Sequence, residues 1–457
     1  MTPTELLPAP PPHAAARRAL LAGSAGNLVE WYEFGVYGCF ATVIAANFFT
    51  PHPATPGGGA EALVATYASF ALAFFFRPVG ALLFGRIGDR FGRRPALVLV
   101  IGLMTLATTL IGLIPTRADI GAAAPWLLTF LRVLQGLSAG GEFGGAVSLM
   151  VEHAPPGRRG LYGAWQSFTV ALGLLAGAGT AAALAAVLPA EALYGWGWRI
   201  PFLLALPLGT VALWLRTTLE EPPGAPPDNP PGRPGAADPA EAVDTTDATD
   251  ATGPTGPTGL GEQARAVVLG IGRIMGWSAA GYAFLVVLPS HLQSALGASF
   301  RDALLATTLV NLGFAASILP AGLLSDRVGR RPVMLGGALG IAVLAHPLLH
   351  LLQSPGASPQ TRATAVLTAG VLVGLLAGPG PAMLAEMFPR RVRCTGLGLS
   401  YALANAVFSG CAGLFITALT ARTADTAVPA HYAAGACALS AVALLTLRGN
   451  DHREPLR

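Results

Sequence analysis

Five ionisable side chains lie inside otherwise apolar stretches of the N-terminal half of the chain. Three are acids, Glu30, Glu33 and Glu142. Two are bases, Arg77 and Arg132. Ionisable groups are costly inside a hydrocarbon layer, so by default they mark a pathway for ions or substrates. If each arginine pairs with one carboxylate, one carboxyl is left to take up and release a proton.

These residue types predict a binding site for a carboxylate and a proton near Glu33, Arg77 and Glu142. The planar fork of an arginine suits the carboxylate of a substrate, which would compete with the acids for the same partner. The alternative is that these acids and arginines form permanent structural ion pairs between helices.

Polar residues recur on one face of the first predicted helix, at 24–49. Asn27, Glu30, Glu33 and Tyr37 are separated by steps of three and four residues. Such steps place side chains on the same face of a helix. We therefore expect a polar stripe within an otherwise apolar span.

Further polar candidates lie in other predicted helices. Arg132 and Glu142 are ten positions apart, which is roughly 15 Å along a helix. Glu142 lies about as far again from the cytoplasmic end of the span, so we expect it near the middle of the membrane. Arg273 could contact a substrate from the second half, or its side chain could reach the surface. We also expect Gln166 and Tyr401 to line the pathway.

Two short motifs occur once in each half of the chain. GRIGDRFGRRP at 85–95 returns as GLLSDRVGRRP at 322–332, and ExxPxxxR at 152–159 returns at 386–393. Both repeats have nearly the same offset, which indicates two parallel six-helix halves with a site between them. Glycines allow close helix approach, and an aspartate can face a helix N-terminus, so we expect these loops to gate the site.

A cluster of arginines that only sets topology is the alternative for these loops. The expected gating residues are Gly85, Asp89, Arg90, Gly92, Arg93, Arg94, Asp326, Arg327, Arg330, Glu152, Arg159, Glu386 and Arg393.

The composition predicts the elements that must position these residues. The chain has 457 residues, of which 53% are hydrophobic and only 11% charged, with a mean hydropathy of +0.57. Soluble domains carry about 25% charged residues, and a membrane helix needs roughly 20 apolar residues. We therefore expect an all-α integral membrane protein with twelve transmembrane helices. The expected spans are 24–49, 64–84, 95–114, 126–150, 161–187, 200–218, 265–289, 302–324, 333–352, 363–386, 395–420 and 429–447.

These spans divide into two bundles. We expect a cytoplasmic N-terminal tail at 1–22, a six-helix bundle at 23–218, a disordered cytoplasmic linker at 219–262, a second six-helix bundle at 263–447 and a cytoplasmic tail at 448–457. The linker is rich in Pro, Gly, Asp and Thr and cannot bury enough apolar area to become ordered. Most arginines outside the spans fall on the side of the N-terminus, which predicts that both termini are cytoplasmic.

The sequence shows no pattern for a cofactor, a metal or a nucleotide. The four cysteines lack metal-ligand spacing, and no phosphate-binding GxxxxGK[ST] loop is present. The formal net charge of +4 fits the topology of a membrane protein better than nucleic-acid binding. The sequence also lacks a nucleophile motif and a set of metal ligands clustered at one depth, which an enzyme in the membrane would need.

Several motifs together resemble the metabolite:proton symporter family of the major facilitator superfamily. They are the repeated loops and GNLVEWYEFGVY at 26–37, FRPVG at 76–80, LRVLQGLSAGGEFGG at 131–145, GWGWRIPF at 195–202 and EMFPRRVR at 386–393. The resemblance covers both halves and leaves out only the linker and the tails. It implies the twelve-helix major facilitator fold and proton-coupled uptake of a small carboxylate or zwitterion by alternating access. Family members take up solutes such as 2-oxoglutarate, citrate, shikimate, proline and betaine.

Three positions depart from the pattern of that family. Glu33 stands where aspartate is usual, Phe143 where tyrosine is usual, and Ala402 where asparagine is usual. These departures bear on the substrate more than on the fold, and proton-antiport efflux of a drug or secondary metabolite is the alternative function. The resemblance implies a monomeric transporter in a bacterial cytoplasmic membrane. Its partners would be a small-molecule substrate, a proton and the lipid bilayer, with no nucleic acid and no cofactor.

Overall fold

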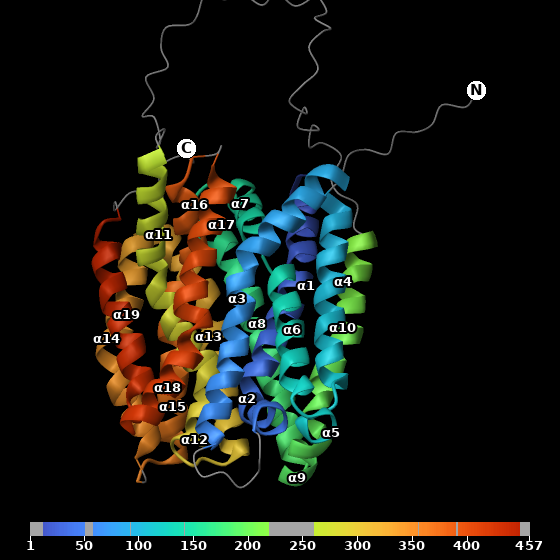
Figure 1. Cartoon of the computed structure of the whole chain (residues 1–457). Helices are drawn as coiled ribbons and strands as arrows, with labels where there is room; N and C mark the ends of the chain where they lie inside the picture. Colours follow the sequence, from blue (N-terminus) through green and yellow to red (C-terminus); the bar gives the residue numbers. More distant parts are fainter. Residues whose placement is uncertain are drawn as a thin grey trace, which may run out of the picture.

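The computed structural model describes residues 12–50, 58–91, 93–140, 142–218, 260–354, 356–389 and 392–447. Throughout these ranges the regular secondary structure is helical, without a strand. Figure 1 shows the long helices packed side by side, with α1 beginning and α19 ending at the same end of the bundle. We call this end the termini end and the opposite one the far end.

The N-terminal half forms six units that run from one end of the bundle to the other. They are α1 (Pro12–Cys39) with α2 (Ala41–Ile44) and η1 (Ala45–Phe49), α3 (Gly58–Phe91), α4 (Arg93–Leu113), α6 (Ala123–Ser138) with α7 (Glu142–Glu152), α8 (Arg159–Val187), and α10 (Arg199–Thr218). Three short segments, α5 (Arg117–Ile120), α9 (Ala190–Ala192) and the π-helix η2 (Leu193–Gly197), lie in the connections.

The C-terminal half repeats this plan with six further units. They are α11 (Leu260–Gly281) with η3 (Tyr282–Val287) and α12 (Leu288–Ser294), α13 (Phe300–Val328), α14 (Arg330–Gln353), α15 (Pro359–Ala377) with α16 (Gly380–Met387), α17 (Arg393–Ala404) with η4 (Asn405–Gly410) and α18 (Ala412–Thr423), and α19 (Val428–Leu445).

The number of spans agrees with the expected twelve. Among the described residues, nine helices are long and apolar enough to cross a membrane, and the bent pair Ala190–Gly197 and Arg199–Leu215 makes a tenth. The other two spans are α1 and the interrupted pair α6 and α7. These two carry all three candidate acids, so the spans with the weakest apolar signal are those with the most chemistry.

Several helices extend beyond the expected bounds. α1 begins at Pro12, in an alanine-rich stretch, and so includes part of the expected tail at 1–22, because alanine strongly favours a helix. α3 continues to Phe91, so most of the expected loop at 85–95 is helical instead. α13 and α14 are joined at Gly329 alone, whose φ of 101° is accessible to glycine without strain. α11 begins at Leu260, inside the expected linker, while 448–457 and most of the linker lie outside the described residues.

Glycines set the distance between α3 and α6, the helices that carry the two candidate arginines. Gly136 and Gly140 are four residues apart and face α3, where a Cβ on Gly136 would lie only 2.0 Å from the carbonyl oxygen of Ala73. Small residues at this spacing let two helices approach closely inside a membrane. The close crossing brings Arg77 of α3 and Arg132 of α6 toward the same face of α1.

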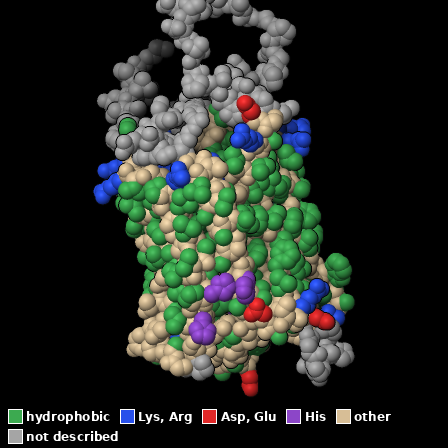
Figure 2. Space-filling model, turned by 90° about the vertical axis from the view of Figure 1, so that its left-hand side faces the viewer, with side chains coloured by type: hydrophobic (Ala, Val, Ile, Leu, Met, Phe, Trp, Pro, Cys, Tyr) green, Lys and Arg blue, Asp and Glu red, His purple; other side chains and the backbone are tan. Residues whose placement is uncertain are grey.

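The two halves meet along α8 against α13 and along α3 against α18. The outer surface between the ends is dominated by apolar side chains, whereas blue and red charged side chains gather near the two ends (Figure 2). Large exposed side chains such as Trp126, Leu82 and Val343 belong to this apolar belt. A belt of this kind matches a hydrocarbon layer flanked by polar interfaces.

Candidate functional site

The polar stripe of α1 faces the interior of the bundle. Asn27, Glu30, Glu33 and Tyr37 are all buried. Asn27 donates from Nδ2 to Thr169 Oγ1 of α8 over 2.6 Å, and the Tyr37 hydroxyl lies 2.8 Å from Ser69 Oγ of α3. The stripe therefore ties α1 to both neighbouring helices at its two ends and leaves the acids between them.

Arg77 and Glu30 form a buried ion pair. Arg77 Nη2 donates to Glu30 Oε1 over 3.0 Å. The guanidinium also lies over aromatic rings, with its Cζ 4.3 Å from the ring centre of Phe74 and 4.9 Å from that of Phe34. A guanidinium is attracted to the face of an aromatic ring, most strongly away from water. Arg77 is thus held by one carboxylate and by rings of α1 and α3.

Arg132 is enclosed by rings rather than by a carboxylate. Its Cζ lies 4.0 Å from the ring centre of Tyr37, 4.7 Å from Phe70 and 5.2 Å from Phe34. Arg132 Nη1 donates to Gln135 Oε1 over 2.7 Å, while Nε and Nη2 have no hydrogen-bond partner among the described residues. The ring of Phe34 therefore contacts both guanidinium groups, and Arg132 retains two nitrogen donors without a partner in the described part of the chain.

Glu33 is the most isolated of the charged groups in this cluster. The residue is 1% exposed, and neither carboxylate oxygen has a hydrogen-bond partner within the described part of the chain. The Thr108 side chain lies beside the carboxyl, near enough for a long, weak hydrogen bond, and the charged neighbours of Glu33 are Glu30 and Arg132. A buried carboxylate without hydrogen bonds is strongly disfavoured relative to the neutral acid. The arrangement suits a group that binds a proton and exchanges it during a cycle.

A small central cavity lies where the two halves meet. It measures about 30 Å³ and is bordered by α1, α8, α13 and the π-helices η3 and η4 with their flanking helices. Its rings come from Trp31, Trp277, Tyr282 and Tyr401, and its polar groups include Asn405. The Tyr282 hydroxyl has no hydrogen-bond partner among the described residues. No cationic side chain is present in the described lining, so the cavity offers rings and neutral polar groups.

Tyr401 closes the cavity against the N-terminal half. Its ring stacks on Phe143 of α7 with centroids 3.4 Å apart and planes 9° from parallel. Trp277 packs against the other side of the Tyr401 ring, with centroids 5.8 Å apart. Two of the family departures bear on this region, because Phe143 supplies a ring without a hydroxyl and Ala402 follows Tyr401 directly.

Of the nine expected pathway residues, only Tyr401 belongs to the described lining of the central cavity. Arg273 donates from Nη2 to Thr446 Oγ1 over 2.9 Å and so joins α11 to the end of α19. Gln166 is buried in α8, and its backbone carbonyl accepts from Asn27. Glu142 is the first residue of α7, but its side chain lies outside the described set.

An ion-pair cluster of the C-terminal half contacts the N-terminal half at the termini end. Arg330 donates from Nε and Nη2 to the two oxygens of Glu386, over 3.2 and 2.9 Å, and from Nη1 to Asp326 over 2.7 Å. Asp326 also accepts from the backbone N–H groups of Gly160 and Leu161 at the start of α8. The aspartate therefore caps a helix of the other half, where the helix dipole favours a negative charge.

Nearby, one ion pair crosses directly between the halves. Arg393 Nη1 of α17 donates to Glu152 Oε1 of α7, and Arg393 Nε donates to the carbonyl oxygens of Ala385 and Phe388. Arg159 is half-buried, whereas Arg90 and Arg327 are exposed. The side chains of the remaining expected gating residues lie outside the described set: Gly85, Asp89, Gly92, Arg93 and Arg94.

Neutral contacts join the halves at the far end. The Tyr67 hydroxyl lies 2.6 Å from Ser290 Oγ, and Thr42 Oγ1 donates to Gln293 Oε1 over 2.9 Å. Contacts between the halves at both ends, around a cavity of about 30 Å³, describe an occluded conformation. The space suffices for about two water molecules, so a metabolite requires a wider state.

Several residues of the site were not singled out from the sequence. Gln135, Phe34 and Phe70 surround Arg132, but in the sequence alone they look like ordinary residues on the face of a helix. A signal for Gln135 was available, because it stands three residues after Arg132 and neighbours at that spacing share a face. Phe34 and Phe70 carry no such signal, since aromatic residues in apolar helices most often belong to the hydrophobic core.

Comparisons with known proteins agree with this arrangement. The family model described as "Sugar (and other) transporter" matches residues 19–224, and the one described as "Major Facilitator Superfamily" matches residues 266–457. The chain is 31% identical to the proline/betaine transporter of Salmonella typhimurium over 91% of this chain and 80% of that one. It is 34% identical to the alpha-ketoglutarate permease of Escherichia coli K12, over 90% and 88% of the two chains.

Two further proteins complete the comparison. The citrate-proton symporter of Klebsiella pneumoniae is 34% identical over 94% of both chains. Among solved structures, a proton:xylose symporter bound to a bromodeoxyglucose superposes with a TM-score of 0.71, covering 95% of both chains at 18% identity. That likeness concerns the fold alone.

Proposed function

The chain belongs to the major facilitator superfamily, and on this premise we propose that it takes up a small zwitterion together with a proton. The matched relatives are carriers, so the chain is a transporter and not an enzyme. Relatives from bacteria and the apolar spans make it a multi-pass protein of the inner membrane. The excess of arginine at the termini end supports cytoplasmic termini, and we further propose that the transporter is a monomer.

The isolated Glu33 carboxyl is the single observation that carries proton coupling. Glu33 is sealed from solvent, and among the described residues its oxygens have no closer polar contact than the neighbouring Thr108, whereas Glu30 is already paired with Arg77. A proton on Glu33 removes the cost of a bare buried charge. A deprotonated Glu33 would draw on the open donors of Arg132. Proton binding and release would therefore change the packing of α1 against α6.

The chemistry of the central cavity supports a zwitterion over a tricarboxylate. Trp31, Trp277, Tyr282 and Tyr401 present aromatic faces, which attract a cationic nitrogen. A substrate with three carboxylates needs several cationic partners, and none stands in the described lining. The carboxylate of a zwitterion would use the neutral donors of the cavity, among them the Tyr282 hydroxyl and the Asn405 amide.

Alternating access follows from contacts at both ends. The cavity has to widen before a metabolite fits, so one set of contacts between the halves must open while the other stays closed. The Arg393–Glu152 ion pair and the bonds from the start of α8 to Asp326 would close the termini end, and the Tyr67–Ser290 contact would close the far end. Proton-antiport efflux remains the alternative, with the same site operating in the opposite sense.

Transport by purified protein in liposomes tests the proposal. Labelled glycine betaine, proline and citrate are offered with an inward proton gradient, and internal pH is followed with a trapped dye. We expect uptake of betaine or proline with internal acidification, and loss of coupled uptake by about tenfold or more in Glu33→Gln. Glu191→Gln, an exposed acid of α9, is the matched control and should transport normally.

Three other outcomes of the liposome experiment would contradict parts of the proposal. Normal acidification-linked uptake by Glu33→Gln would remove Glu33 from the proton pathway. Uptake of citrate alone would overturn the zwitterion assignment, and outward movement of substrate driven by an inward proton gradient would favour efflux.

A further inference from the structure

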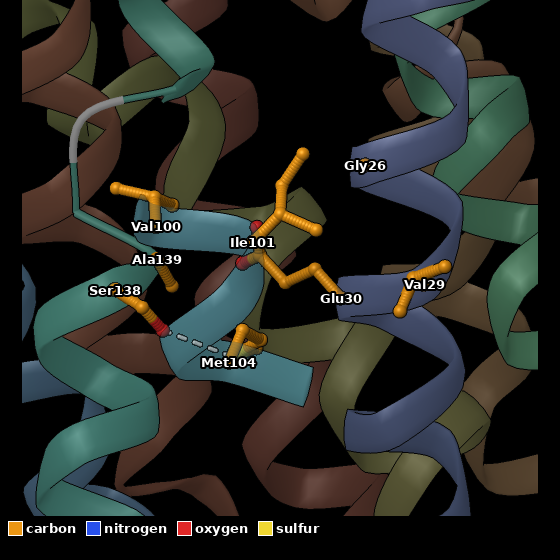
Figure 3. Close-up of a pocket in the computed structure, with 8 residues that line it drawn as sticks. All are labelled: Gly26, Val29, Glu30, Val100, Ile101, Met104, Ser138 and Ala139. Atoms are coloured by element: carbon orange, nitrogen blue, oxygen red, sulfur yellow. Dashed lines mark hydrogen bonds between the residues drawn. The ribbon is translucent and has the colours of Figure 1, made fainter. Parts of the chain in front are cut away.

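A small recess lies beside Glu30, away from the central cavity. It is formed by α1, α4 and the end of α6, and it shares no described lining residue with the central cavity. Its volume is about 10 Å³, the space that one water molecule needs. Figure 3 shows Glu30 reaching from α1 toward Ile101 and Ser138 across this recess.

The recess exists because the fourth span is interrupted. α6 ends at Ser138 and α7 begins at Glu142, so the last carbonyl groups of α6 have no continuing helix to supply donors. Ala139 lines the recess at this break, and the Ser138 hydroxyl beside it donates to Met104 Sδ and to the carbonyl of Gln135. With the Glu30 carboxyl opposite, the recess offers a water molecule several polar partners, as ordered internal water requires.

The two acids of α1 differ in their access to this recess. Glu30 is 8% exposed and borders it, whereas Glu33 is 1% exposed and does not. The two side chains are three residues apart on one helix face, so they are direct neighbours. Glu30 lies one turn nearer the termini end, which is also the direction in which an imported proton has to travel.

We infer that the recess is the exit route of the proton, separate from the route of the substrate. The O–H bond of protonated Glu33 breaks, and the proton passes to a carboxylate oxygen of Glu30. Glu30 then gives it to a water molecule in the recess and returns to its pair with Arg77. The inference rests on the proposed proton-coupled transport and adds to it the path and the residue that delivers the proton.

The experiment compares net uptake with exchange in liposomes. Net uptake requires proton release in every cycle, whereas exchange of labelled for unlabelled substrate at equal pH proceeds with the proton still bound. Ala139→Leu and Ile101→Phe place extra carbon atoms at the recess. Leu99→Phe makes a comparable change on the exposed face of α4 and is the control.

We expect the two filling variants to lose net uptake by about tenfold or more while exchange stays within about twofold of the unmodified protein. Raising the internal pH should partly restore net uptake, because release to a less acidic compartment is favoured. The Leu99→Phe control should keep both activities.

Two results would overturn the inference about the exit route, and a third would contradict the proposed function on which it rests. Unchanged net uptake in both filling variants would show that the proton leaves elsewhere. Equal loss of uptake and exchange in both, with the control intact, would mean that filling the recess acts on the structure and not on the proton. Uptake without acidification in the unmodified protein would instead contradict the proposed proton coupling itself.

Discussion

The two ends of the bundle are closed by different chemistry. At the termini end, Arg330 is 3% exposed and bound to two carboxylates, and Arg393 bridges to Glu152 across the halves. At the far end the halves meet through hydroxyls, an amide and rings, with Phe40 and Phe300 centroids 5.7 Å apart. Removing one partner of a buried ion pair costs several kcal/mol, whereas a neutral hydrogen bond contributes about 1 kcal/mol.

This difference indicates which gate holds the occluded state. The termini end behaves as a specific lock, since the Arg393–Glu152 ion pair and the two bonds from α8 to Asp326 must separate together before it opens. The far end is adjustable, because neutral contacts can be lost one at a time at small cost. A transporter built in this way opens more readily at the far end, where an imported substrate would enter.

The largest expected effect comes from weakening the Arg330 cluster with Glu386→Gln. Arg330 then loses its bidentate partner and keeps only Asp326 of its two carboxylates, which leaves a buried charge with fewer partners in the closed state. Opening would hydrate that charge, so opening of the termini end should become easier by about 3 kcal/mol. A cysteine introduced at Ser278, in the cavity lining, reports opening through its reaction with an impermeant thiol reagent. Labelling from the termini side should rise about 100-fold at most, because each 1.4 kcal/mol is tenfold.

Glu191→Gln in the same cysteine background is the control for this measurement. Labelling that rises equally from both sides would mean a general loosening of the protein. Labelling that does not change would show that the Arg330 cluster is not a gate.

A smaller effect is expected from Gly160→Ala, which adds a methyl group between two helices at the termini end and removes no charge. A Cβ at Gly160 would meet the Gly322 carbonyl oxygen at 2.6 Å, where α8 crosses α13. Overpacking of this kind costs about 1–3 kcal/mol and should shift the protein toward opening at the termini end. Gly179→Ala, with open space around its Cβ in the same helix, should leave labelling and thermal stability unchanged. Unchanged labelling and thermal stability in Gly160→Ala would contradict the close crossing of α8 and α13.

The sequence identified the residues of these ion pairs better than it predicted the elements that carry them. Repetition of Asp326, Arg330, Glu386 and Arg393 within a duplicated pattern marked them as gating candidates. Their expected loops are helix ends, because a glycine at 329 turns the chain in a single residue.

The central site was less predictable. Burial and sign of charge identified Glu30, Glu33, Arg77 and Arg132 as a cluster. Which acid pairs with which arginine depends on the crossing of α3 and α6. The aromatic enclosure of Arg132 depends on packing between distant segments, which a single helix pattern does not record. Arg273 shows the converse, since its depth in a helix resembled a site residue while its partner is Thr446.

The smallest expected effect is at the far end, in Tyr67→Phe. The variant loses the hydrogen bond to Ser290 but keeps the ring that packs against Phe70, so the closed far end should weaken by about 1 kcal/mol. Labelling of the Ser278 cysteine from the far side should rise about fivefold, with no increase from the termini side. Ser290→Ala should give the same shift, and the double variant should add little more, because both changes remove one contact. A shift as large as that of Glu386→Gln would mean that the far end is locked as firmly as the termini end, and the asymmetry between the two gates would then be lost.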